Sequence, residues 1–366
     1  MSSLDNTRKS IDRIDSEMAE LFIKRMKAAE EVADYKKTNG LPIEDKTREA
    51  AMIAKNAETV PAAYRPYYIN FLNSLITESK RYQSLILRKM TVAYSGVEGA
   101  FAHIASRRIF PDAEKIACPD FETAYRMVEN GTYNCAVLPI ENSYAGDVGR
   151  VMDLAYSGKL SIAGIYDMPL KQSLLAKPGT SKSDIRAVKS HPQALTQCMP
   201  YLLKTGWQLI PAENTAVSAK EISESGDNST AVIGAVEAAE LYGLEVLEAQ
   251  INQQQTNTTR FAVFTAAPAK ISPNDGHFSI MFNCKNIPGA LGKAISIISK
   301  YDFNLKCLKS HPTGIENWEY YFYAEGEGSL WSENGSAMLA GLREICNVVK
   351  LLGSFEKEVS LEKHGG

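Results

Sequence analysis

The sequence contains few of the residues that build metal sites, disulfide frameworks or membrane spans. Its 366 residues include only 6 cysteines and 5 histidines, and no two cysteines form a CxxC pair. This argues against a zinc site or disulfides and fits reduced thiols in the cytosol. No apolar run is long enough to cross a membrane, and Met1 to Lys9 is polar, without a signal-peptide core. We expect a cytoplasmic protein with no metal, no other cofactor and no membrane partner.

A strong excess of charge of either sign is also missing. Lys and Arg number 40 and Asp and Glu 43, which gives a net charge of -3. Without a global basic surface, nucleic acid is not an expected partner. An anionic ligand would have to be held by a few well-placed cations or by helix N-termini.

The pattern along the chain changes twice and predicts a multidomain protein with boundaries at 1–89, 90–268 and 277–357. The first segment is typical of three helices, and the second alternates short strands with helices, as α/β domains do. The third has the strand-helix-strand-strand-helix-strand order of a ferredoxin-like α+β domain. The expected helices of the first segment cover 5–37, 45–57 and 65–88; the expected later strands of the second cover 135–139, 161–166, 186–189, 208–210, 230–233 and 259–264; those of the third cover 278–284, 304–309, 318–325 and 348–353.

The first predicted helix would be about 50 Å long, too long for a lone three-helix domain to cover. Its apolar residues have heptad spacing, and Arg25 occupies a seam position among them. Arg25 either extends along its methylenes to water or is a buried cation that awaits an anionic ligand. Lys36 lies about 20° from Arg25 around the helix and favours the second interpretation. Arg8 lies about 25 Å away, so any ligand that it binds would belong to a second site, most simply that of a two-fold partner.

Together with Asp45 and Arg48 in the second predicted helix and Ser79 and Gln83 in the third, these positions resemble the all-helical chorismate mutases in order and spacing. The resemblance implies an intertwined dimer in which Arg8 reaches the neighbour's site, and a concerted Claisen rearrangement of chorismate to prephenate. It also implies catalytic roles for Arg8, Arg25, Lys36 and Gln83, and substrate-binding roles for Asp45, Arg48, Glu49 and Ser79. The alternative is a helical dimerisation arm without chemistry.

Four polar stretches stand out in the α/β segment. Gly96 and Gly99 form a glycine turn after a strand, and Pro139 to Ser143 follows a strand where ligand loops of α/β sheets lie. Ser190 to Gln193 opens a helix whose free N–H groups could bind a carboxylate. In the fourth stretch, Thr259 and Arg260 enter a strand together; a hydroxyl beside a cation suits protonation of a leaving group while an anion is held.

In this order the four stretches resemble the prephenate dehydratases, over about residues 91–267. The resemblance implies two α/β lobes with a cleft between them, and decarboxylative dehydration of prephenate to phenylpyruvate. Thr259 would be the catalytic hydroxyl, Arg260 a structural or substrate-holding cation, and the cleft would be lined by Asn142, Ser190, Gln197 and Glu213. Two rivals stay open: an enzyme that takes arogenate, the aminated analogue, and a non-catalytic two-lobed ligand-binding protein.

The last segment resembles the amino-acid-binding ACT domains through Asn286-Ile287-Pro288-Gly289-Ala290-Leu291. The resemblance implies that phenylalanine is an effector, in a site with Asn286, Gly289, Ala290, Leu291 and Ser310. Lys309 and His311 stand where related dehydratases have an acid and an arginine, so we expect weak feedback inhibition. The alternative is a plain ferredoxin-like domain for dimer contacts. The whole would be a homodimer or higher homo-oligomer that makes phenylpyruvate from chorismate for phenylalanine biosynthesis.

Overall fold

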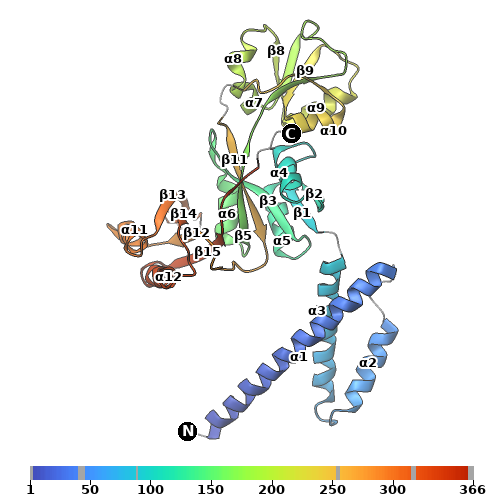
Figure 1. The fold of residues 1–366 in the computed structure, drawn as a ribbon, viewed down its shortest axis with the longest axis vertical. Coiled ribbons are helices and arrows are strands. Elements are labelled where there is room, and N and C mark those ends of the chain that lie inside the picture. The colour runs from blue at the N-terminus through green and yellow to red at the C-terminus, as the bar shows by residue number, and fades with distance from the viewer. Residues whose placement is uncertain (1–2, 40–45, 88–89, 253–255, 315–318, 362–366) are drawn as a thin grey trace. The chain divides into compact units, whose positions relative to one another are not determined.

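The computed structural model describes residues 3–39, 46–87, 90–252, 256–314 and 319–361. The chain forms two compact units, Met1–Met90 and Thr91–Gly366, which are described one at a time (Figure 1). Within the described helices, none is long and apolar enough to cross a membrane. All six cysteines are free.

The first unit consists of α1 (Ser3–Asn39), α2 (Lys46–Glu58) and α3 (Arg65–Leu87). Both α1 and α2 pack against α3, and Ala33, Leu72 and Ile76 are buried there. The N-terminal half of α1 is not covered within the described chain (Figure 1). Its apolar side chains are between 45% and 63% exposed, at Leu4, Ile11, Ile14, Met18, Leu21 and Phe22. The predicted seam therefore exists, and half of it faces solvent.

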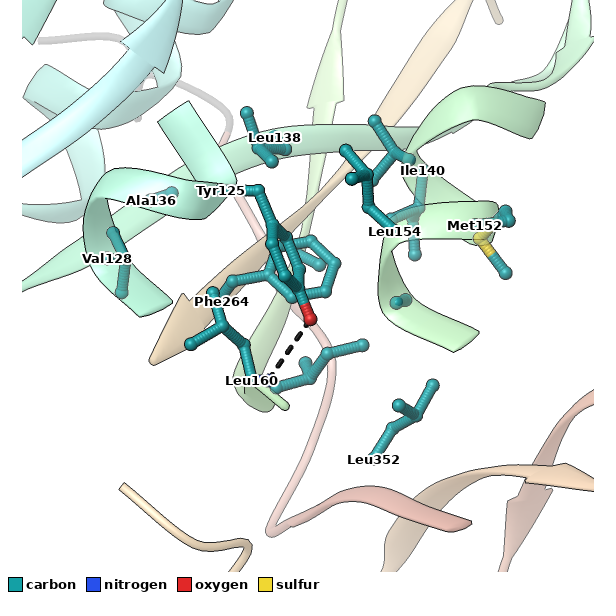
Figure 2. Packing of buried hydrophobic residues seen from close by; sticks show 14 of the residues in the cluster. Tyr125, Val128, Ala136, Leu138, Ile140, Met152, Leu154, Leu160, Phe264 and Leu352 are labelled. Atoms are coloured by element: carbon teal, nitrogen blue, oxygen red, sulfur yellow. Dashed lines mark hydrogen bonds between the residues drawn. The ribbon is translucent and has the colours of Figure 1, made fainter. Parts of the chain in front are cut away.

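The second unit begins with a lobe built on a seven-stranded mixed sheet, in the order β16-β5-β11-β3-β1-β2 with β4 paired to β3. Figure 2 shows the core beneath it, where the rings of Tyr125 and Phe264 meet edge to face with centroids 5.4 Å apart. The Tyr125 hydroxyl accepts a hydrogen bond from the backbone N–H of Leu160 at 3.1 Å, so this buried oxygen is satisfied. The elements are β1 (Thr91–Ser95), α4 (Phe101–Ile109), β2 (Glu114–Cys118), α5 (Phe121–Glu129), β3 (Cys135–Asn142), β4 (Gly146–Asp147), α6 (Gly149–Ser157), β5 (Ser161–Pro169), β11 (Thr258–Thr265) and β16 (Val359–Ser360).

The chain leaves this lobe after β5, builds a second lobe and returns to enter β11. The two crossing segments are joined where Leu170 N–H donates to Asn257 O at 2.7 Å and Gln172 N–H donates to Asn252 Oδ1 at 3.0 Å. The second lobe has a five-stranded sheet in the order β10-β6-β9-β7-β8. Its elements are β6 (Ser173–Ala176), β7 (Ala187–Ser190), α7 (Pro192–Gln197), α8 (Met199–Leu202), β8 (Gln208–Pro211), α9 (Thr215–Glu224), β9 (Thr230–Gly234), α10 (Val236–Tyr242) and β10 (Glu245–Glu248). The expected two-lobed organisation is confirmed.

A four-stranded antiparallel sheet completes the second unit, in the order β13-β14-β12-β15, which is the expected ferredoxin-like topology. Its helices α11 and α12 pack together over one face. The other face contributes Met281, Tyr321, Tyr323 and Leu352 to the hydrophobic core of the first lobe. We call this part the ferredoxin-like module; it consists of β12 (His277–Asn283), α11 (Ala290–Lys300), β13 (Asn304–Pro312), β14 (Tyr320–Glu327), α12 (Glu333–Ile345) and β15 (Val348–Phe355).

Candidate active sites

The helical unit contains a cavity of about 340 Å³ bordered by all three helices. Six of the residues expected in the mutase site line it together: Arg25, Lys36, Arg48, Glu49, Ser79 and Gln83. The remaining lining is Ala28, Ala29, Val32, Met52, Ile76 and Lys80. Four cations against one carboxylate make this cavity suited to a ligand with more than one negative charge.

Arg25 is the cation at the seam of α1, and it points into the helical unit. Its Nη1 donates to Ser79 Oγ and, at 3.5 Å, to Leu75 O. Burial lowers the pKa of the Arg25 guanidinium. Gln83 is buried as well, and its Oε1 has no hydrogen-bond partner within the described residues. A partly buried cation and an unsatisfied amide oxygen in one cavity are what a polar ligand would complete.

Lys80 was not predicted from the sequence, although it lines the same cavity and its Nζ lies 3.0 Å from Glu49 Oε2. A signal was present, since Ile76, Ser79, Lys80 and Gln83 have the spacing of one helix face. Arg8 does not line this cavity; it lies exposed on the uncovered half of α1. Asp45 lies outside the described residues.

The second unit holds a cavity of about 440 Å³ at the lobe crossing. Loops at the ends of β3 and β7, the crossing segment at Leu170 and Gln172, and the starts of α4 and α9 contribute to its wall. Three of the expected cleft residues line it with Thr259: Asn142, Gln197 and Glu213. His191, Asp147 and Gln172 also line it, and the last two were not predicted. Gln172 and Gln197 each have a buried Oε1 without a hydrogen-bond partner in the described part of the chain.

Thr259 lies opposite Asn142 in the pairing of β11 with β3. It is 6% exposed, and its Oγ1 accepts a hydrogen bond from Asn142 Nδ2 at 2.9 Å. The amide of Asn142 is oriented by the N–H groups of Tyr144 and Ala145, which donate to its Oδ1 at 3.0 and 2.9 Å. Because Thr259 Oγ1 accepts from Asn142, the hydroxyl proton is left to point elsewhere, and the cavity is beside it.

Two expected cleft residues do not line the cavity. Ser190 is fully buried, and its hydroxyl donates to Ile233 O at 2.8 Å, which ties β7 to β9. Arg260 follows Thr259 in β11 and therefore faces the opposite side of the sheet. There its guanidinium bonds Asp167 Oδ1 at 3.2 Å and Glu325 Oε2 and Glu358 Oε1 at 2.6 Å each. Its placement supports the structural interpretation of Arg260 and not the substrate-holding one.

Comparison with known proteins agrees with this division of the chain. Residues 7–84 match the family Chorismate mutase type II and residues 92–269 match Prephenate dehydratase. A bifunctional chorismate mutase/prephenate dehydratase of Aquifex aeolicus is 31% identical over 370 residues, which cover 99% of this chain and 100% of that protein. The chain belongs to this family. As a bifunctional chorismate mutase/prephenate dehydratase, it converts chorismate to prephenate and prephenate to phenylpyruvate in phenylalanine biosynthesis.

Two further relatives cover the dehydratase part. Arogenate dehydratase/prephenate dehydratase 1 of Arabidopsis thaliana is 33% identical over 287 residues, 74% of this chain and 73% of that protein. The crystal structure of a prephenate dehydratase from Arthrobacter aurescens in complex with L-Phe has a TM-score of 0.67 and 27% identity, and it covers 73% of this chain and 90% of that one.

In this bifunctional enzyme, the ferredoxin-like module contacts α6 and the strand β4 that precedes it. Asp147 of β4 lines the cavity of the second unit. On β13, Lys309 forms ion pairs with Asp147 and, at 2.8 Å, with Glu141. The Tyr321 hydroxyl donates to Asp153 Oδ1 on α6 at 2.9 Å. Lys350 donates to the carbonyls of residues 155 and 158 at the C-terminal end of α6, both at 2.5 Å. The module therefore contacts β3 and β4 before α6, and α6 itself at its middle and its C-terminal end.

The residues expected to bind an effector lie on the module itself. Gly289 has a φ of +80°, a left-handed conformation that glycine adopts without strain, and α11 begins at the next residue. Ala290 and Leu291 are in its first turn, and Asn286 precedes it. Ser310 is exposed on β13 and alternates with Lys309 and His311, so it faces away from the lobe that those two contact.

Proposed function

We propose that the cavity of the helical unit is the mutase site and that Arg25 is its central cation. Chorismate carries two carboxylates, and its rearrangement breaks an ether bond while a carbon–carbon bond forms, with no proton transfer. The residues need only hold a compact conformer and stabilise charge that develops at the ether oxygen. Arg25 and Arg48 would bind carboxylates, and Lys36 and Gln83 would donate to the ether oxygen. The cation-rich lining, in which Arg25 is partly buried, supports this assignment.

We infer that a second copy of the chain covers the N-terminal half of α1. Six apolar side chains along one helix are a poor surface to leave in water. Arg8 lies on that half of the helix, away from its own cavity, and would reach the partner's cavity in such a homodimer.

For the dehydratase we propose that Thr259 is the group that helps hydroxide leave. The bond between the ring and its carboxylate breaks, the electron pair moves through the ring, and the hydroxyl at the opposite carbon departs and takes up one proton to become water. Thr259 would donate to that oxygen, in a cleft lined by Asn142, Gln197 and Glu213. The observation that carries this proposal is the Asn142–Thr259 hydrogen bond, which leaves the threonine proton available at the cavity.

The test is Thr259→Ala, assayed with supplied prephenate and again with chorismate. We expect the dehydratase rate to fall by roughly 100-fold or more while the mutase continues, so that prephenate accumulates. Thr258→Ala is the matched control, because Thr258 precedes Thr259 in β11 and its hydroxyl donates to Thr256 O at 3.3 Å. Phenylpyruvate formation at the parental rate by Thr259→Ala would refute the role of the hydroxyl.

A second substrate is favoured by one specific observation, the charge of the dehydratase cavity. Glu213 lines it, the other lining carboxylate, Asp147, is paired with Lys309, and none of the described lining residues is a lysine or an arginine. An ammonium group, which arogenate has and prephenate lacks, would be attracted to such a wall. The ratio of kcat/KM for arogenate to that for prephenate measures this preference. We expect Glu213→Gln to lower the ratio; an unchanged ratio would contradict it.

We further propose that the ferredoxin-like module is an ACT domain that binds phenylalanine through Asn286, Gly289, Ala290, Leu291 and Ser310, between two paired copies. The Arthrobacter relative with bound L-Phe supports the ligand, and the contacts of Lys309 with the cavity wall support an effect on the dehydratase.

We also propose a cytoplasmic location, which the six free cysteines support.

A further inference from the structure

Asn257 is buried next to the catalytic pair of the dehydratase, although it does not line the cavity. It is 2% exposed, and its Oδ1 accepts a hydrogen bond from Asn142 Nδ2 at 2.9 Å. The same nitrogen donates to Thr259 Oγ1, also at 2.9 Å. The two N–H groups of the Asn142 amide therefore have two close acceptors, and Thr258 O is a third, longer one at 3.3 Å.

The position of Asn257 is fixed by the backbone on both sides of it. The Ser143 hydroxyl accepts from Thr258 N–H at 3.0 Å and donates to Thr256 O at 3.2 Å, and Ser143 N–H donates to Thr258 O at 2.9 Å. The carbonyl of Asn257 accepts from Leu170 N–H across the lobe crossing. The segment that carries Asn257 is thus attached to the cavity loop at Ser143 and to the crossing segment at Leu170.

We propose that Asn257 is a positioning residue for the dehydratase reaction and acts only through Asn142 and Thr259. By accepting one N–H of Asn142, it directs the other N–H to Thr259 Oγ1. A hydroxyl that accepts a hydrogen bond becomes a better donor itself, because hydrogen bonds in a chain polarise one another. The Thr259 proton is thereby turned toward the departing oxygen. The inference rests on the proposed role of Thr259.

Removal of the acceptor should leave this N–H of Asn142 with only the Thr258 carbonyl, at 3.3 Å, as a longer alternative partner. The Asn142 amide would then be held through its Oδ1 by Tyr144 and Ala145, and through its Nδ2 only by Thr259 Oγ1 and the longer bond to Thr258 O. Asn257→Ala should lower kcat for prephenate by about ten-fold, a part of the 100- to 10,000-fold that a positioned acid contributes. KM should change less than two-fold, since Asn257 does not line the cavity. Asn257→Asp keeps an acceptor at the same place and should keep more activity than Asn257→Ala.

The matched control is Asn252→Ala. Asn252 is also buried, in the same returning segment, and accepts from Gln172 N–H, but no described bond joins it to Asn142 or Thr259. We expect kcat within two-fold of the parent for this variant. Thermal unfolding and mutase activity of each preparation show that the proteins are folded and equally active in the other unit.

The deciding experiment places Asn257→Ala in the Thr259→Ala background. If Asn257 acts through the threonine hydroxyl, the second substitution should lower kcat by less than two-fold there, against about ten-fold in the parent. Equal losses in both backgrounds, a loss confined to KM, or the same fall in Asn252→Ala would overturn the inference. Full activity of Thr259→Ala alone would instead refute the proposed function, so the two failures are distinguishable.

Discussion

Lys309 of the ferredoxin-like module pairs with Asp147, which lines the cavity beside Thr259. Although burial opposes the charged form, hydrogen bonds to Asp147 and Glu141 raise the pKa of Lys309, so the ion pair is intact near neutral pH. His311 Nε2 lies 3.5 Å from the same carboxylate. Lys309 and His311, which we expect from the sequence to depart from the pattern of related dehydratases, therefore both lie at the contact between the module and the cavity wall.

We expect Lys309→Ala to weaken inhibition of the dehydratase by phenylalanine, because Asp147 and Glu141 would no longer be paired with Lys309 on β13. The half-inhibitory concentration should rise by about five-fold or more, the lower end of common allosteric couplings. Lys306→Ala is the control, because Lys306 lies on the same strand but pairs with Glu327 and Glu358.

The double change Lys309→Glu with His311→Arg restores the charges that related dehydratases have at these positions. We expect phenylalanine to inhibit the dehydratase of the unaltered protein weakly, and the half-inhibitory concentration to differ in the double variant. A dehydratase titration with phenylalanine measures both. If phenylalanine inhibits the unaltered protein tightly and inhibits the double variant equally, these residues do not set the coupling between the module and the dehydratase reaction.

Arg25→Ala should abolish most of the mutase activity and leave the dehydratase nearly intact on supplied prephenate. Loss of one donor to a charged transition state costs roughly 3–4 kcal/mol, or about 100- to 1000-fold in rate. Rates of both reactions in one preparation are the measurement. An equal fall in both would show that Arg25 is needed for folding.

Arg8→Ala and Arg25→Ala should each be inactive as mutases if Arg8 serves the partner's site. A mixed dimer would then contain one site with both changes and one site with neither. Co-refolding of the two variants should restore part of the activity. Heterodimers that are demonstrably formed yet inactive would exclude the crossing of Arg8.

The attachment of Lys350 to α6 should make stability depend on pH. Burial lowers the pKa of Lys350 to about 8, below its ordinary value of 10.5. Between these values the unfolded chain binds the additional proton, so this group's contribution to stability is lost below about pH 8 and recovered as pH rises toward 10.5. We expect the free energy of unfolding of the parent, relative to Lys350→Met, to increase over that range in denaturant titrations. A constant difference would contradict the lowered pKa.

The helices and most strands could be predicted because their periodicity is strong, as in the 37-residue helix α1 and in β11. The strands β2, β6 and β10 were not predicted, because their sequences show no clear alternation, and neither were the two-residue strands β4 and β16. In the helical unit, helical spacing placed Arg25 on a seam and Ser79 with Gln83 on one face, and the resemblance to chorismate mutases joined them in one expected site. Ser190 and Arg260 were assigned from motifs, and a motif does not say which way a side chain faces.

Adjacent positions of β11 serve different partners: Thr259 faces the cavity and Arg260 faces the carboxylates of Asp167, Glu325 and Glu358. A strand exchanges its two faces when its register shifts by one residue. A shift of one residue in the register of Thr259 and Arg260 would thus turn the guanidinium toward the cavity and the hydroxyl toward the acids, and so lose the role of the hydroxyl and the bond between Arg260 and Glu325 together. These two positions can therefore change one at a time by substitution, whereas a change of register alters both at once.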